Sequence, residues 1–174
     1  YEETICESAK HNWGKGPTGF WVMLFIFSKI PELIDTVFIV LRKKPLIFLH
    51  WYHHVTVLLY CWHSYATEAP QALYFIAMNY AVHAVMYGYY MLMALALKPA
   101  WLPPVVVTLL QLAQMVVGIF VTVRAVLYQA GGLDCRVNKT NSVLGLAMYS
   151  SYFLLFGKLF FENYVLKRSK AKAA

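Results

Sequence analysis

Charged residues are scarce in this chain. They make up 13% of its 174 residues, and only 8 are Asp or Glu, whereas about a quarter of a typical soluble domain is charged. So few charges cannot cover a surface that faces water. Hydrophobic residues reach 60%, well above the soluble average. The composition therefore excludes an ordinary soluble domain and predicts a membrane protein, and the length favours a single bundle.

The sequence also has no initiator Met and no charged, cleavable segment of the kind that forms a signal peptide. It begins at Tyr1. We interpret this start as an N-terminal truncation and expect that one or more upstream helices are missing.

Five hydrophobic segments are long enough to cross a hydrocarbon core of ~30 Å, which needs about 20 helical residues. Pro and Gly lie in the connections between them, as expected where helices end. We therefore predict an all-α, polytopic transmembrane helix bundle that forms one domain over residues 1–174. Its helices are predicted at Gly19–Leu41, Leu46–Ala66, Ala69–Leu97, Pro103–Tyr128 and Ser142–Leu166.

The net charge of +7 comes from basic residues near the predicted helix ends. Such clusters mark cytosolic ends, and no basic helix face is left for phosphates, which excludes nucleic acid as a partner. The turn at 42–44, the connection at Lys98 and the basic tail at 167–174 are therefore predicted to be cytosolic. Within the tail, Lys170 and Lys172 resemble a dilysine signal for return to the endoplasmic reticulum, and an ordinary basic tail explains them equally well.

Only three cysteines are present, and two of them fall in segments that this topology places on the lumenal side. Disulfides persist there, so we predict a Cys6–Cys135 bridge that pins the first and last of the five helices together. Cys61 lies within the second segment and is predicted to be a small packing residue. Asn138 begins an Asn-Lys-Thr glycosylation pattern in a lumenal loop, although such triplets are common by chance.

Histidines dominate the polar residues of the second and third segments. Polar groups inside a membrane are costly and usually functional. His50, His53 and His54 stand at i, i+3 and i+4, which lie on one helix face. A lone membrane histidine is explained by a hydrogen bond to a neighbouring helix, but three together predict metal ligation or acid/base or nucleophilic chemistry. Asn79 and His83 share a face of the third segment, so a fourth imidazole can meet the cluster.

Tyrosines and amides on neighbouring faces have two interpretations each. Tyr87 and Tyr90 lie on the face of His83, where packing between helices is the commoner role. The fourth segment carries Thr108, Gln111 and Gln114, which suit either helix packing or substrate contact.

The first segment contains three charged residues on one stripe, Lys29, Glu32 and Asp35. One interpretation is a neutral network of buried ion pairs. The other is that Asp35 or Glu32 orients an imidazole while Lys29 binds an anionic substrate. Pro31 lies between them and should bend the helix, because proline removes a backbone hydrogen bond.

Four motifs, one in each of the first four segments, together resemble the ELO family of very-long-chain fatty acid elongases, the membrane 3-ketoacyl-CoA synthases. The resemblance covers essentially the whole chain, and four motifs in order are far more specific than one. They are Lys29-x-x-Glu32-x-x-Asp35, His50-x-x-His53-His54, Asn79-x-x-x-His83-x-x-Met86-Tyr87-x-Tyr89-Tyr90 and Thr108-x-x-Gln111-x-x-Gln114.

The resemblance implies about seven helices around an acyl-chain tunnel, of which this chain would supply the last five, with the absent helices completing the barrel. It implies an acyltransferase of the endoplasmic reticulum membrane that condenses long-chain acyl-CoA with malonyl-CoA, without cofactor or metal, and releases CO₂ and CoA. Membrane lipid and other enzymes of the elongation cycle are further implied partners. Trp51, Tyr52 and Pro45 resemble members that extend saturated and monounsaturated chains.

The resemblance also implies that His53 and His83 bond to the acyl substrate. We assign His53 as the nucleophile, with His50 and His54 tuning or orienting it. Asp35 is expected as a carboxylate partner and Asn79 as a donor to an oxyanion or enolate. The expected substrate-binding residues, of which the basic three would meet the phosphates of CoA, are Lys29, Glu32, Arg42, Lys43, Lys44, Tyr87, Tyr90, Gln111 and Gln114.

Three alternatives remain. Cys61 is a rival nucleophile, although two helical turns, roughly 10 Å, separate it from His54. A di-iron desaturase or hydroxylase also carries such a histidine motif, but that resemblance implies about eight ligating histidines, whereas this chain has six, of which four can reach one site. A non-enzymatic lipid transporter or receptor would explain an aromatic lining but not four clustered imidazoles with a carboxylate.

Overall fold

The computed structural model describes residues 5–97, 101–132 and 135–166, and the regular elements within these ranges are all helical. The predictions for Lys98 and for the tail at 167–174 lie outside the described residues. The elements are α2 (Ala9–Asn12), α3 (Gly16–Ser28), η1 (Pro31–Leu33), α4 (Ile34–Leu41), α5 (Phe48–Ala66), α6 (Ala72–Ala94), α7 (Pro104–Ala130), α8 (Lys139–Phe160) and the π-helical η2 (Phe161–Leu166).

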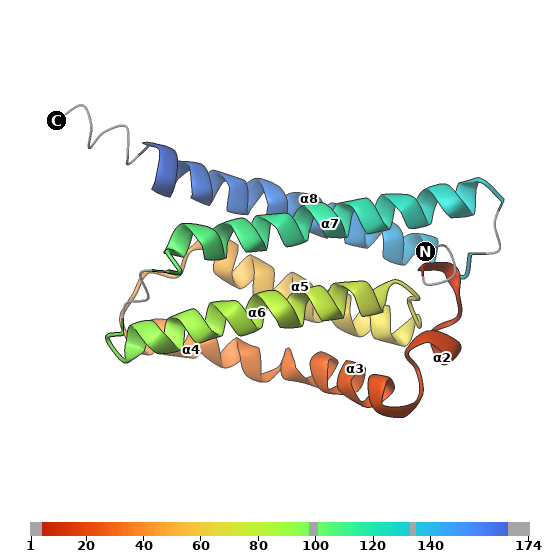
Figure 1. Ribbon diagram of the computed structural model, residues 1–174, viewed down its shortest axis with the longest axis horizontal. Coiled ribbons are helices and arrows are strands. Elements are labelled where there is room, and N and C mark those ends of the chain that lie inside the picture. The colour runs from red at the N-terminus through yellow and green to blue at the C-terminus, as the bar shows by residue number, and fades with distance from the viewer. Residues whose placement is uncertain (1–4, 98–100, 133–134, 167–174) are drawn as a thin grey trace.

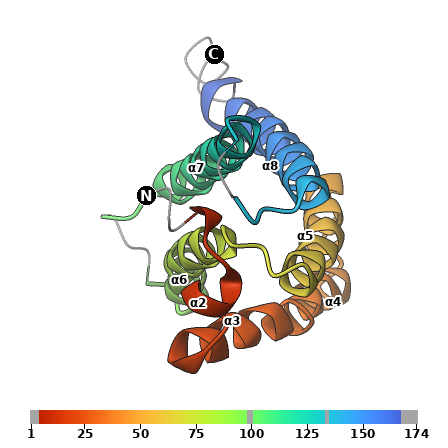
Figure 2. The ribbon, with the colours of Figure 1, turned by 90° about the vertical axis from the view of Figure 1, so that its right-hand side faces the viewer.

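The long helices form five columns that run back and forth along the molecule, with α3 and α4 end to end in one of them (Figure 1). Packing contacts join α3 to α5, α5 to α8, α8 to α7, α7 to α6, and α6 back to α3. The columns therefore close into a ring, which Figure 2 shows from one end. The described columns form this ring with one another, and the contribution that we expected from further helices stays a prediction.

The first column is divided where one continuous helix over 19–41 was predicted. Pro31 has no N–H to donate, and around it the chain tightens. The N–H groups of Lys29 and Ile30 donate to the carbonyls of Ile26 and Phe27, at 3.3 and 3.1 Å. This three-residue spacing is that of a 3₁₀ turn, so the predicted bend is a break between two aligned helices.

Two described helices are long and apolar enough to cross a membrane by length and composition alone. They are α7, with mean hydropathy 2.2, and α8 together with η2, with 1.5. The other predicted spans carry the histidines and tyrosines of the candidate site or break at Pro31, which lowers or interrupts their hydropathy. Many large apolar side chains nevertheless face outward, Trp21, Leu41 and Leu154 among them, as expected of a surface in contact with lipid or further helices.

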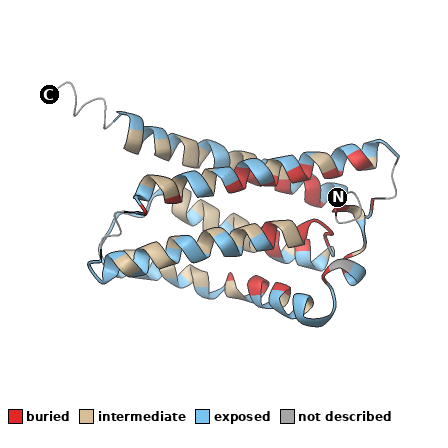
Figure 3. Cartoon of the chain, viewed as in Figure 1, coloured by how far each residue is buried: buried red, intermediate tan, exposed pale blue. Residues whose placement is uncertain are grey.

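Buried side chains gather at one end of the bundle (Figure 3). They include three residues each of α3, α5 and α6, whereas α4 has none. Cys6 and Cys135 form a disulfide at this end. It joins the N-terminal segment to the α7–α8 connection, and Ile5 packs with Ala125 and Tyr128 of α7. The bridge therefore ties down the segment that precedes the first column, where we had expected it to pin two helices directly.

Glycine allows the close approach of α7 and α8. A Cβ atom built on Gly118 of α7 would lie 2.8 to 3.1 Å from the ring of Tyr149, which is buried against Phe75. We expect Gly118→Ala to lower the stability by about 1–3 kcal/mol, as overpacking does, and the melting temperature in detergent by several degrees. Gly157 of α8 has no atom within 4 Å of its Cβ position, so Gly157→Ala should leave the melting temperature unchanged or raise it. Equal melting temperatures for both variants would contradict the packing argument.

Candidate active site

A cavity of about 800 Å³ lies inside the ring, in the half of the bundle away from the disulfide. All five columns contribute to its wall. The lining side chains combine imidazoles, a carboxylate, amides and tyrosines with apolar groups, which suits a ligand with one reactive polar group and a long apolar part. The polar lining residues are Asp35, Arg42, His50, His53, His54, Asn79, His83, Tyr87, Tyr90, Thr108, Gln111 and Gln114.

The three histidines of α5 lie together on this wall. The rings of His50 and His54 have centroids 4.4 Å apart, and those of His53 and His54 are 5.5 Å apart. Their contact follows from the i, i+3 and i+4 spacing. His83 lines the same cavity from α6. The structure therefore gathers the four imidazoles at one cavity, as the sequence predicts.

His53 is held by two aromatic residues of α8 that the sequence analysis did not single out. Its ring centroid is 4.9 Å from that of Tyr152 and 6.3 Å from that of Phe156. The hydroxyl of Tyr152 donates to the backbone carbonyl of His53 at 3.2 Å and lies 2.5 Å from the hydroxyl of Thr56. The i, i+4 spacing of Tyr152 and Phe156 shows that they share a face of α8, but not that this face meets α5.

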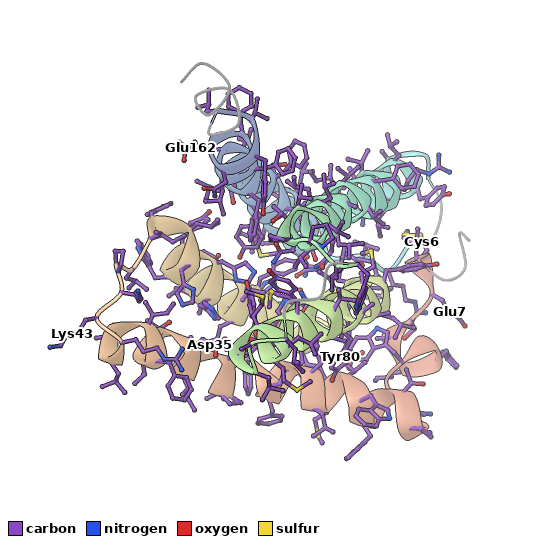
Figure 4. The ribbon with its side chains drawn as sticks, turned by 60° about the vertical axis from the view of Figure 1, so that its left-hand side comes forward. Cys6, Glu7, Asp35, Lys43, Tyr80 and Glu162 are labelled. Carbon is purple, nitrogen blue, oxygen red and sulfur yellow. A yellow bond between two sulfur atoms is a disulfide. The ribbon has the colours of Figure 1, made fainter. Side chains whose placement is uncertain are left out.

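His50 and Asp35 each have a hydroxyl group as hydrogen-bond partner. The Nε2 atom of His50 lies 3.0 Å from the hydroxyl of Thr36, which ties α4 to α5. Asp35, on the side of α4 that faces α6 (Figure 4), accepts a hydrogen bond of 2.8 Å from the hydroxyl of Tyr87. The hydrogen bond of Asp35 thus runs to a tyrosine, and its expected role as a carboxylate partner of an imidazole stays a prediction. The polar neighbour of His50 is a hydroxyl group.

Tyr87 and Tyr90 line the cavity from the same face of α6 as His83. The ring of Tyr87 lies 5.8 Å from that of His83, and Tyr90 follows at 6.4 Å from Tyr87. Gln111 of α7 donates to the sulfur of Met86 at 3.2 Å. Tyr87, Tyr90, Gln111 and Gln114 therefore lie where a substrate could touch them, while their binding role stays a prediction.

Lys29 and Glu32 do not line this cavity. The ammonium of Lys29 donates to Oε1 of Glu32 at 2.7 Å and to Oδ1 of Asn79 at 3.1 Å. It also lies 4.2 Å from the centre of the Phe25 ring, and the side chain is only 2% exposed. This arrangement matches the interpretation as a buried ion pair. It disfavours the expectation that Lys29 binds an anionic substrate, because the ammonium is buried, lies off the cavity wall and already donates to Glu32 and Asn79.

Of the three basic residues in the turn after α4, one lines the cavity and two lie outside it. Arg42 lines the cavity, whereas Lys43 and Lys44 are exposed and lie off its wall. Figure 4 shows Lys43 pointing away from the bundle. A phosphate at the mouth could therefore meet Arg42 within the cavity and the two lysines only from outside.

Cys61 lies on a second, smaller cavity of about 40 Å³ in the tightly packed half of the bundle. This cavity is mostly apolar, and Asn79 is the one described residue that lines both cavities. The position of Cys61 off the large cavity disfavours it as the nucleophile. Among the described residues, no group of three or more His, Cys, Asp or Glu side chains has an arrangement that could hold a metal ion.

Comparison with known proteins gives a consistent picture. The sequence profile of the family described as ELO: GNS1/SUR4 matches residues 1–172. "Very long chain fatty acid elongase 6" of Drosophila melanogaster is 52% identical over 84% of this chain and 47% of its own length. "Fatty acid elongase 3" of Trypanosoma brucei brucei is 46% identical, over 97% and 56%. "Very long chain fatty acid elongase 6" of Gallus gallus is 42% identical, over 98% and 63%.

The chain spans about half the length of the curated relatives it matches. No solved structure matches it.

Proposed function

This chain belongs to the ELO family, and from that premise we propose that it carries the active site of a fatty acid elongase. The reaction joins a long-chain acyl-CoA to malonyl-CoA, consumes one proton, and gives a 3-ketoacyl-CoA, CO₂ and free CoA. The observation that carries the proposal is the cavity of about 800 Å³ with four imidazoles on its wall. The cavity can enclose an acyl chain while its thioester lies beside the histidines.

In the first step, a nitrogen lone pair of His53 attacks the thioester carbonyl. The carbon–sulfur bond breaks, and the CoA thiolate leaves with the proton of the imidazole N–H, so that an acyl-imidazole remains. The contacts of Tyr152 with the ring and backbone of His53 support this role because they fix the orientation of the ring. A nucleophile held in one orientation loses less entropy on reaching the transition state.

In the second step, malonyl-CoA loses CO₂, and the electron pair of the broken carbon–carbon bond becomes an enolate. The enolate carbon attacks the acyl-imidazole carbonyl, the new carbon–carbon bond forms, and the imidazole leaves and takes a proton. Hydrogen-bond donors aimed at the developing negative charge lower the barrier of such a step. Asn79 and His83, both on the cavity wall, are the side chains we assign to this task.

The substrates are expected to enter from the end of the bundle where Arg42 lies on the cavity wall. Arg42 would meet the phosphates of CoA, with Lys43 and Lys44 adding positive charge outside the mouth. The acyl tail would extend toward the disulfide end, which we place on the lumenal side of the endoplasmic reticulum membrane. Saturated and monounsaturated acyl-CoA are the proposed substrates, and other enzymes of the elongation cycle remain candidate partners.

The test uses the purified full-length protein and an ordinary long-chain saturated acyl-CoA. Without malonyl-CoA, we expect an acyl adduct on the α5 peptide by mass spectrometry, and malonyl-CoA should convert the adduct into 3-ketoacyl-CoA. Product without an adduct would keep the elongase and overturn the covalent histidine. Neither product nor adduct would overturn both, and bound iron in that case would favour an oxidase. Binding that depends on chain length but gives no turnover would favour a lipid carrier.

A further inference from the structure

Lys29 donates to two side chains, of which Glu32 lies off the large cavity and Asn79 lines it. Oε1 of Glu32 also lies 3.4 Å from the hydroxyl of Ser28, so this carboxylate oxygen accepts from two side chains next to the break in the first column. The other partner of Lys29 is Asn79, which lies on α6 and reaches the wall of the large cavity. The ammonium thus connects a fixed carboxylate on one column to a cavity residue on another.

The contact with Lys29 determines which end of the Asn79 amide faces the cavity. An ammonium group carries three donors and no acceptor, so only the amide oxygen of Asn79 can face it. The structure has this orientation, with Nζ donating to Oδ1 at 3.1 Å. The Nδ2 group of Asn79 makes no hydrogen bond to any of the described residues. Turning the amide over would place its N–H groups against the ammonium. The hydrogen bond would be lost, and the two sets of donor hydrogens would repel each other.

We propose that Lys29 is a positioning residue, which fixes the amide of Asn79 so that its N–H group is offered to the enolate oxygen. This inference rests on the proposed function. The negative charge on the enolate oxygen develops after CO₂ has left, and an N–H donor already in place stabilises it without reorganisation. Glu32 neutralises Lys29, so the ammonium acts through the orientation of Asn79.

A positioning role for Lys29 should affect the two halves of the reaction differently. Acyl transfer to His53 does not need the enolate donor, whereas condensation does. A purely structural role for Lys29 would instead impair both halves together, because a distorted first column would disturb the whole cavity. Adduct formation and condensation are therefore measured separately, as single-turnover rates with acyl-CoA alone and after addition of malonyl-CoA.

The key variant is Asn79→Asp in the full-length protein. It retains an oxygen for Lys29 but replaces the N–H donor by a second oxygen. We expect condensation to fall about 100-fold, the usual effect of removing such a donor, while adduct formation changes less than about threefold. Equal losses in the rates of adduct formation and condensation would show a structural effect of the substitution and overturn the inference.

A double-mutant cycle then tests whether Lys29 acts through Asn79. Lys29→Met is made together with Glu32→Gln, so that no buried carboxylate loses its cation, and every rate is compared with that of Glu32→Gln alone. We expect Lys29→Met to lower condensation at least about tenfold when Asn79 is present and less than about threefold in an Asn79→Ala background. Lys158→Met, at a side chain that is 73% exposed, is the control and should leave both rates unchanged.

Two results are decisive against the inference. If Lys29→Met lowers condensation by the same factor in both backgrounds, Lys29 does not act through Asn79. If the wild-type protein forms no 3-ketoacyl-CoA at all, the proposed function fails first, and the role of Lys29 fails with it. An active wild type with additive variants overturns only the role of Lys29.

Discussion

Replacing His53 by glutamine is expected to abolish the acyl adduct and to lower 3-ketoacyl-CoA formation by at least about 10³-fold, the scale on which loss of a nucleophile acts. Glutamine keeps a polar group of similar size next to Tyr152 but has no nitrogen lone pair able to attack a thioester. The measurement is intact mass after incubation with acyl-CoA, followed by quantification of product with malonyl-CoA.

The same helix offers a matched control for this experiment. His63 lies ten residues after His53, and its Nδ1 atom is 3.0 Å from Oδ1 of Asn141 in the packed half of the bundle. It does not line the large cavity. His63→Gln should therefore retain the adduct and most of the activity. An adduct that survives in His53→Gln would refute the assignment, and its loss in Cys61→Ser would move the nucleophile to Cys61.

Removing the disulfide should have the second large effect, this time on stability. Cys6 and Cys135 are 129 residues apart, so the bridge greatly restricts the unfolded chain. For a loop of this length, chain entropy gives an upper estimate of about 5 kcal/mol, and losses of about 2–5 kcal/mol are usual. We expect the variant with both cysteines replaced by serine to melt about 10 °C below the wild type in detergent, since each kcal/mol corresponds to about 2–4 °C at this size.

Reductant provides the internal check on this second prediction. It should lower the melting temperature of the wild type toward that of the double-serine variant and leave the variant itself unchanged. A wild-type melting temperature that does not respond to reductant would mean that the bridge contributes nothing. A response of the double-serine variant would mean that reductant acts elsewhere.

The sequence predicted those features that depend on spacing within one helix. The contact of His50 with His54 follows from a four-residue offset. The position of Pro31 marked where the first column departs from a regular helix, although not that it would divide into α3, η1 and α4. The predicted placement of Cys6 and Cys135 on one side of the membrane likewise indicated that these two segments share an end of the bundle.

Features that depend on which helices become neighbours could not be predicted in this way. Tyr152 meets His53 only because α8 packs beside α5, and no local pattern in α8 indicates that neighbour. The hydrogen bond from Tyr87 to Asp35 could not be predicted either, because it depends on α6 placing Tyr87 beside α4. For Lys29, both interpretations fit its charge and depth, and only the position of Asn79 on α6 favours one.

The uneven distribution of buried side chains has a mechanical consequence. Columns that are packed together at one end and separated by a cavity at the other can pivot about the packed end. Local opening requires least free energy where few side chains are buried, and α4, with none, lies at the open end. We therefore expect the mouth to widen and narrow around a bulky nucleotide headgroup by hinge-like spreading of the columns, while the disulfide end acts as the fixed pivot.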